Sequence, residues 1–133
     1  MNSWPVLLVE DQPDDQFLTL RTLKKMKISN VAVANEGEEA LRVLWGGIAS
    51  DQRASSLPEL IILDLRMPKV DGFQFLERMN TDDRMKRIPV IVLSSSPQES
   101  DKARCRALGV KAYLNKPLEP DAFNLVLKKI SLS

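Results

Sequence analysis

Residues 60–72 have the sequence LIILDLRMPKVDG, and this stretch decides the fold class. Its first four residues, Leu60–Leu63, are apolar without alternation, which is typical of a strand buried on both faces of a sheet. Asp64 follows directly. A carboxylate at the end of a buried strand is costly without a partner, so Asp64 is predicted to be functional rather than incidental.

Four further apolar runs resemble Leu60–Leu63, and amphipathic helical patterns separate them. The other predicted strands are Val6–Val9, Val31–Ala34, Val90–Leu93 and Ala112–Leu114. The predicted helix faces are Phe17, Leu20, Leu23 and Met26; Leu41, Leu44, Trp45 and Ile48; Phe75, Leu76 and Met79; a weakly apolar stretch near 98–108; and Phe123, Val126, Leu127 and Ile130. Five strand–helix units in this order predict a doubly wound (βα)5 fold of the α/β class, with a parallel sheet and helices on both faces.

Proline and glycine positions predict where these helices begin and end. Pro13 is expected at the start of the first helix, Gly46–Gly47 at the end of the second, and Gly109 at the end of the fourth. The polar, serine-rich residues 46–58 are expected to form a surface loop. Neither a linker nor a sequence repeat is visible, so residues 1–133 are expected to form one domain without an output domain.

Composition excludes several classes of function. A net charge of +1 argues against a broad nucleic-acid surface, and no apolar run approaches the roughly 20 residues of a membrane span. The apolar N-terminal stretch lacks the basic segment of a signal peptide, and Cys105 is the only cysteine, so a cytoplasmic location is expected. The absence of histidine excludes a Ser-His-Asp triad and a histidine-ligated metal. Cys105 itself is expected to be incidental.

Polar residues stand where four of the five predicted strands stop. They are Glu10–Asp11, Asp64, Ser94 and Lys116–Pro117. Ligand sites of open α/β sheets lie beyond the carboxyl ends of the strands, so these side chains should converge. Three carboxylates and one lysine in a single crevice indicate an oxygen-ligated Mg²⁺ with a phosphoryl group beside it.

Each of these residues also has an ordinary structural explanation. Asp11 could cap a helix, Ser94 lies in a run of three serines that suits a loop, and Tyr113 could be a core or edge aromatic. Lys116–Pro117 alone is a common turn. The functional interpretation therefore depends on the coincidence of all of them at successive strand ends.

The combined pattern resembles the receiver domains of bacterial two-component response regulators. It consists of Glu10–Asp11, the run from Asp64 to Pro68 with Asp71–Gly72, then Ser94, then Lys116–Pro117, and it covers essentially the whole chain. The resemblance implies the strand order 2-1-3-4-5. The acid at position 10 is glutamate rather than the more frequent aspartate, and the segment before Asp64 is longer than in chemotaxis-type regulators. That length resembles the stand-alone regulators partnered with bacteriophytochrome histidine kinases.

The resemblance implies a role for each residue of the pattern. Asp64 would be the phosphoacceptor, and Asp11, Asp64 and the backbone carbonyl of Arg66 would ligate Mg²⁺, for which Mn²⁺ can substitute. Glu10 would act through a metal-bound water, and Lys116 and Ser94 would contact phosphoryl oxygens. Tyr113 would be the aromatic switch residue that responds to Ser94. Lys116–Pro117 is also a candidate cis peptide bond.

The resemblance also implies a signalling protein rather than an enzyme. Mg²⁺-dependent self-phosphorylation and slow autodephosphorylation would accompany that role. Its expected partners are a sensor histidine kinase, phytochrome-type under the narrower resemblance, and a downstream protein target; a carrier or sink in a phosphate relay is the alternative. Nucleic acid and membrane are not expected partners.

Three rival functions would place different demands on the same residues. A haloacid-dehalogenase-type phosphatase would need an acid two residues after its nucleophile, where this chain has Arg66. A flavodoxin-type carrier would need a hydroxyl- and glycine-rich loop after the first strand, where this chain has acids. A pseudo-receiver that has lost phosphorylation would keep the fold, although here the acids and Lys116 are all present.

The last helix carries a second apolar set besides the face that is expected to pack on the sheet. It consists of Leu118, Ala122, Leu125 and Leu132, nearly opposite the first set at about 100° per residue. This stripe predicts a homodimer through the last strand and fifth helix. Alternatively, Leu118 packs before the helix begins and Leu132 lies in a frayed tail.

Overall fold

The computed structural model describes residues 5–49, 57–66, 71–95 and 98–130. A five-stranded parallel sheet in the order β2-β1-β3-β4-β5 forms its centre, which confirms the predicted doubly wound α/β fold. The strands are β1 (Val6–Val9), β2 (Val31–Ala34), β3 (Leu60–Leu63), β4 (Val90–Ser94) and β5 (Ala112–Asn115). The helices are α1 (Pro13–Lys25), α2 (Gly37–Ala49), α3 (Gly72–Met79), α4 (Asp83–Lys86), α5 (Glu99–Ala107) and α6 (Pro120–Lys129).

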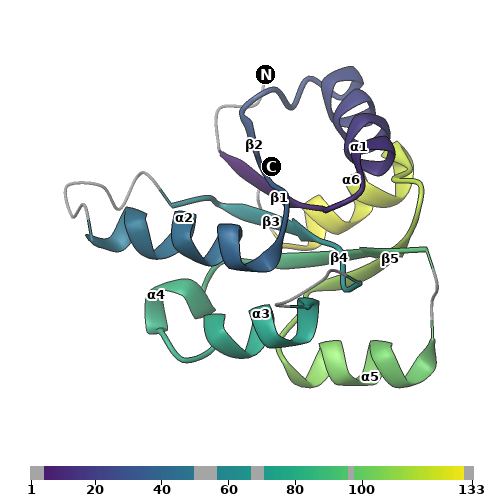
Figure 1. Ribbon diagram of the computed structural model, residues 1–133. Coiled ribbons are helices and arrows are strands. Elements are labelled where there is room, and N and C mark those ends of the chain that lie inside the picture. Colours follow the sequence, from purple (N-terminus) through teal and green to yellow (C-terminus); the bar gives the residue numbers. More distant parts are fainter. Residues whose placement is uncertain (1–4, 50–56, 67–70, 96–97, 131–133) are drawn as a thin grey trace.

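Helices cover both faces of the sheet (Figure 1). Alternate residues of each central strand point to opposite faces, so Ile61 and Leu63 of β3 enter one cluster while Leu60 and Ile62 enter the other. The first cluster is completed by α2, α3, α4 and α5, and the second by α1 and α6. The two cores hold the sheet rigid, and its strand ends can therefore hold side chains in fixed positions.

Burial on both faces, predicted for all five strands, holds only for the central three. All residues of β1, β3 and β4 are buried, whereas β2 and β5 are largely half-exposed. The reason is their place in the strand order, because β2 and β5 are the two edges and each has a neighbour on one side alone.

The apolar face predicted for the first helix is wrong at Phe17. Its side chain is 62% exposed, and the ring lies 5.8 Å from the guanidinium carbon of Arg21, whereas Leu23 is fully buried. A spacing of three residues falls about 60° short of a full turn at each step, so a series at that spacing drifts around the helix. The buried side of α1 is centred on Thr19 and Leu23, and Phe17 lies well outside it.

Helix boundaries agree with the prolines but not with every glycine. Pro13 begins α1, and Gly109, with a φ of +89°, follows the end of α5 as predicted. Gly46–Gly47 does not end α2, which continues to Ala49, so residues 46–49 are helical where a loop was predicted. Glycine costs only about 1 kcal/mol in a helix interior, and the buried anchors Leu41 and Leu44 come before it. Residues 50–56 of the predicted loop lie outside the described residues.

Two further features were not predicted correctly. The short helix α4 was missed, although Asp82 caps it through the backbone N–H groups of Arg84 and Met85. Leu118, assigned to an outward stripe, is buried in the second cluster, because it precedes α6, whose N-cap is Glu119. Leu125 is 61% exposed and Ala122 half-exposed, and Leu132 lies outside the described residues. No helix in the described part of the chain is long and apolar enough to cross a bilayer.

Candidate functional site

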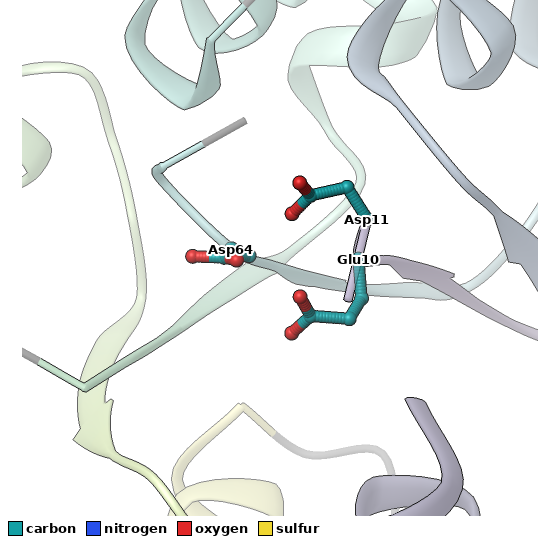
Figure 2. A group of neighbouring side chains, drawn as sticks. All are labelled: Glu10, Asp11 and Asp64. Carbon is teal, nitrogen blue, oxygen red and sulfur yellow. The ribbon is translucent and has the colours of Figure 1, made fainter. Parts of the chain in front are cut away.

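Three carboxylates meet at the carboxyl ends of two neighbouring strands. Glu10 and Asp11 directly follow β1, and Asp64 directly follows β3, which pairs with β1. One oxygen from each of the three lies within 4.8 Å of the others, and Figure 2 shows the group. Glu10 and Asp64 are buried, with 1% and 6% of their surface exposed, and Asp11 is half-buried. The sheet therefore concentrates negative charge where little water can screen it.

A single lysine reaches this cluster from the segment after β5. The Lys116 Nζ lies 2.8 Å from Glu10 Oε1, 2.8 Å from Asp15 Oδ2 and 3.3 Å from Asp64 Oδ2. Its backbone N–H donates to the Ser94 carbonyl at 2.8 Å, which extends the pairing of β4 with β5 by one residue. The Lys116–Pro117 peptide bond is cis. Thus the last strand positions the one side-chain cation that pairs with these acids among the described residues.

Crowding of these charges changes two pKa values. Burial raises the pKa of Glu10 to about 7, and the nearby charge of Asp64 adds to this while the hydrogen bond from Lys116 opposes it. Burial alone would lower the pKa of Lys116, but its hydrogen bonds to Asp15 and Glu10 and the charge of Asp64 raise it above its ordinary value. Lys116 therefore stays positive, whereas Glu10 can take up or release a proton near neutral pH.

The segment after β3 is held close to the backbone of Asp64. The Arg66 N–H donates to Asp64 Oδ1 at 3.1 Å, and the Gly72 N–H donates to the Leu65 carbonyl at 3.0 Å. A Cβ on Gly72 would lie 2.6 Å from the Leu65 Cα, so only glycine fits this approach. Asp71 caps α3 in a reciprocal capping box with Gln74. The predicted motif residues Met67 and Pro68 lie outside the described residues.

The two residues assigned to a switch lie on the neighbouring strands. Ser94 ends β4 and is 2% exposed. Tyr113 of β5 packs against the first cluster, and its hydroxyl is buried without a hydrogen-bond partner among the described residues. The Lys102 Nζ lies 5.8 Å from the centre of its ring. A buried phenol oxygen without a hydrogen-bond partner is a costly arrangement.

The three carboxylates fit a hard divalent cation. Asp11 Oδ1 is buried and has no hydrogen-bond partner in the described part of the chain, so an oxygen-seeking ligand would satisfy it. The donors are all oxygens, which Mg²⁺ and Mn²⁺ accept and which thiolate- or imidazole-seeking metals do not prefer.

Two contacts of the site were not predicted from the sequence. Asp15 binds Lys116, and no residue spacing links these two positions in the sequence. The Arg66 side chain forms an ion pair with Asp101 of α5, and no residue spacing predicts this pair. Both contacts join elements that only the fold brings together.

Two cavities differ in their relation to this site. One of about 220 Å³ lies beside it, lined by Asp15, Leu18, Thr19, Ser95, Lys116 and Pro117. A larger one of about 530 Å³ is lined by residues from the ends of α3 and α5 and the start of β4, such as Met79, Leu108 and Val90. Its lining contains no carboxylate, so the larger cavity is not the place for the predicted chemistry.

A family model described as "Response regulator receiver domain" matches residues 6–128 of this chain. Among solved structures, the bacteriophytochrome response regulator AtBRR is 38% identical with a TM-score of 0.84, and the match covers 100% of this chain and 96% of that one.

Curated relatives of this chain are also response regulators. Response regulator Rcp1 of Synechocystis is 35% identical, over 91% of this chain and 82% of the relative. Its Mn²⁺-bound structure superposes with a TM-score of 0.75 at 32% identity, covering 98% and 94% of the two chains. Response regulator Rre1 of Synechocystis is 30% identical over 94% of this chain, which spans only half of that relative's length.

Proposed function

This chain belongs to the response regulator receiver family, and we propose that it accepts a phosphoryl group on Asp64. As a receiver, it is a signalling protein of a two-component system. The observation that supports the assignment to Asp64 is geometric: this carboxylate follows the central strand β3, belongs to the three-acid cluster and lies 3.3 Å from Nζ of Lys116. Glu10 shares these two contacts but follows β1, where its Oε2 accepts from the Gln12 N–H.

The chemistry follows from the charges around Asp64. A carboxylate oxygen attacks the phosphorus of the donor, an acyl phosphate bond forms, and the bond from phosphorus to the leaving group breaks. A carboxylate is a weak nucleophile, and both it and the donor are anionic, so the approach needs positive charge. Lys116 supplies one such charge, and a divalent cation bound by Asp11 and Asp64 would supply the rest.

Receivers bind Mg²⁺ or Mn²⁺ at an acidic site of this kind. In this chain, we propose Asp11 and Asp64 as direct ligands, with the Arg66 carbonyl as a third and Glu10 acting through water. The buried, partnerless Asp11 Oδ1 supports that assignment. Mn²⁺ is proposed as a substitute because the related Rcp1 has a Mn²⁺-bound structure.

Asp64→Asn and wild type, incubated with acetyl phosphate and Mg²⁺, test the acceptor by intact-mass spectrometry. Wild type is expected to gain one phosphoryl mass, only when the metal is present, and Asp64→Asn to gain none. Asp14→Asn is the matched control, because Asp14 is exposed and lies outside the site. Equal phosphorylation of Asp64→Asn and wild type would exclude Asp64 as the acceptor.

Transmission from the site is proposed to run through Ser94, Lys116 and Tyr113. Phosphoryl oxygens would accept hydrogen bonds from Ser94 and Lys116, and movement of Ser94 at the end of β4 would change the space open to Tyr113 on β5. Lys116→Ala should retain some phosphorylation but lose its effect on partner binding, and Ser94→Ala should act more mildly. Unchanged, phosphorylation-dependent partner affinity in both variants would contradict this route.

The binding partners are proposed from the similarity of this chain to known receivers. Receivers act with histidine kinases and downstream targets, and the match to AtBRR supports a phytochrome-type kinase for this chain. A cytoplasmic location, slow autodephosphorylation and signalling through protein contacts remain part of the proposal.

Homodimerisation through β5 and α6 is proposed on a smaller surface than the sequence predicted. Of the predicted stripe, Leu125 is the exposed leucine of α6 and Leu118 is buried. Leu125→Asp would place two unpaired charges in a two-fold interface and should give a folded monomer. Sedimentation with and without acetyl phosphate tests this, and a wild type that stays monomeric in both states at high concentration would refute the dimer.

A further inference from the structure

Lys116 has one partner that stands outside the three-acid cluster. A lysine ammonium has three N–H donors, and three carboxylates lie near this one: Glu10, Asp64 and Asp15. The first two come from strand ends and belong to the cluster that could hold a metal. Asp15 comes from the first turn of α1 and does not belong to it. Its side chain is 35% exposed, against 2% and 7% for Glu10 and Asp64.

A divalent cation and Lys116 would compete for the same oxygens. The cluster acids have one side-chain cation among the described residues, Lys116, whose Nζ now binds both Glu10 and Asp64. A metal ligated by Asp64 and, through water, by Glu10 must weaken both contacts. The Lys116 side chain is only 12% exposed, so hydrogen bonds to water cannot replace the contacts that its ammonium loses.

We propose that Asp15 is a positioning residue that holds the Lys116 ammonium while a metal occupies the acid cluster. The Asp15–Lys116 contact, 2.8 Å long, uses no oxygen that the metal needs. The contact therefore persists when Glu10 and Asp64 bind the metal, and it keeps the Lys116 ammonium paired and close to Asp64. The proposal rests on the proposed metal site and deepens it: Asp15 never touches metal or phosphoryl group, but it makes their binding compatible with a buried lysine.

The position of Asp15 suits this role. Asp15 is the second acid of the first turn of α1. The buried residues Leu23 and Thr19 anchor this helix, so the backbone that carries the Asp15 carboxylate is held in place. Gln16, the next residue, donates from its Nε2 to the backbone carbonyl of Glu10 and to Asn35 Oδ1, which ties the same turn to the ends of β1 and β2. The contact is therefore supported from two sides.

The Mg²⁺ dissociation constant, measured by titration calorimetry without a phosphodonor, tests the proposal. Asp15→Asn should raise it about tenfold, the scale of one charge-assisted hydrogen bond lost. Asp14→Asn is the matched control: it removes the same charge one residue earlier, and Asp14 is exposed with no hydrogen bond or ion pair to any described residue. It should change the constant by less than about twofold.

A Lys116→Ala background separates positioning from bare charge. If Asp15 acts through Lys116, then Asp15→Asn should leave the Mg²⁺ dissociation constant of Lys116→Ala unchanged. A through-space effect of the Asp15 charge on the metal would persist in that background. Equal effects of Asp15→Asn and Asp14→Asn, or an undiminished effect in Lys116→Ala, would overturn the proposal.

Urea unfolding of the same variants gives a second readout that a merely structural role would not produce. Asp15→Asn should destabilise the protein more in saturating Mg²⁺ than in EDTA, because Lys116 keeps two other partners when no metal is bound. Equal destabilisation in both solutions would mean a structural contact only and would overturn the proposal. A wild type that is phosphorylated with Mg²⁺ while Asp15→Asn behaves like Asp14→Asn would overturn the role of Asp15 and leave the phosphoacceptor standing.

Discussion

Glu10 offers the sharpest quantitative prediction, and Glu10→Gln is the perturbation. Glu10 is 1% exposed, and burial raises the pKa of its carboxyl group from 4.5 to about 7. Between these two values, the folded protein keeps a proton on Glu10 that the unfolded chain has already released. By linkage, the free energy of unfolding contributed by Glu10 must fall as the pH rises from about 4.5 to about 7. Glutamine has nearly the same shape and cannot ionise, so this fall should be absent in the variant.

The expected magnitude follows from the two pKa values. At about 1.4 kcal/mol per pKa unit, a rise from 4.5 to about 7 corresponds to about 3 kcal/mol in total. Most of it falls between pH 5 and pH 8. The free energy of unfolding of Glu10→Gln relative to wild type should therefore increase by about 2–3 kcal/mol over that range. Lys116 adds nothing to this slope, because its pKa is raised from 10.5 and it stays charged at both ends of the range.

The assay is urea unfolding of both proteins in EDTA at four or five values of pH between 5 and 8. EDTA is needed because a bound cation would stabilise the ionised carboxylate and remove the effect. The comparison of the two proteins cancels the titration of all other groups that the substitution leaves alone. A stability difference that stays constant with pH, or that shifts in favour of wild type as pH rises, would refute the reasoning that burial governs Glu10.

Four other outcomes are expected from the same structure. The Mg²⁺ affinity of wild type, by calorimetry, should increase from pH 5 to about 7 and then level off, because binding releases the Glu10 proton; Glu10→Gln should show a weaker dependence. Leu23→Ala should lower the free energy of unfolding by about 2–5 kcal/mol in urea, since Leu23 is fully buried. Gly72→Ala should slow phosphorylation by acetyl phosphate in the mass assay, because the new Cβ would displace the backbone of Leu65. Cys105 should resist alkylation in the folded protein and react in urea, because burial raises its pKa to about 11; rapid labelling of the folded state would contradict this.

The amino-acid sequence alone determined the class of fold and the place of the chemistry. Apolar runs marked all five strands to within one residue of their observed ends. For β1, β3 and β4 the reason is burial on both faces, which requires continuously apolar residues. The charged residues that interrupt those runs, such as Asp64, could be assigned to one edge because parallel strands all end there. Both signals are local, because each depends on a few adjacent residues and can be recognised without knowing which other residues they contact.

The tertiary structure alone decided which side chains share a partner and which face water. The exposure of Phe17 and the burial of Leu118 depend on the orientation of whole helices against the sheet, which residue spacing fixes only approximately. The contact of Asp15 with Lys116 joins residues 101 positions apart, and the sequence marked neither as the other's partner. Such contacts are set by how the packed helices and strands bring distant charges together in a buried site. There the cost of an unpaired charge selects the partners, and that cost exists only once the surrounding core has formed.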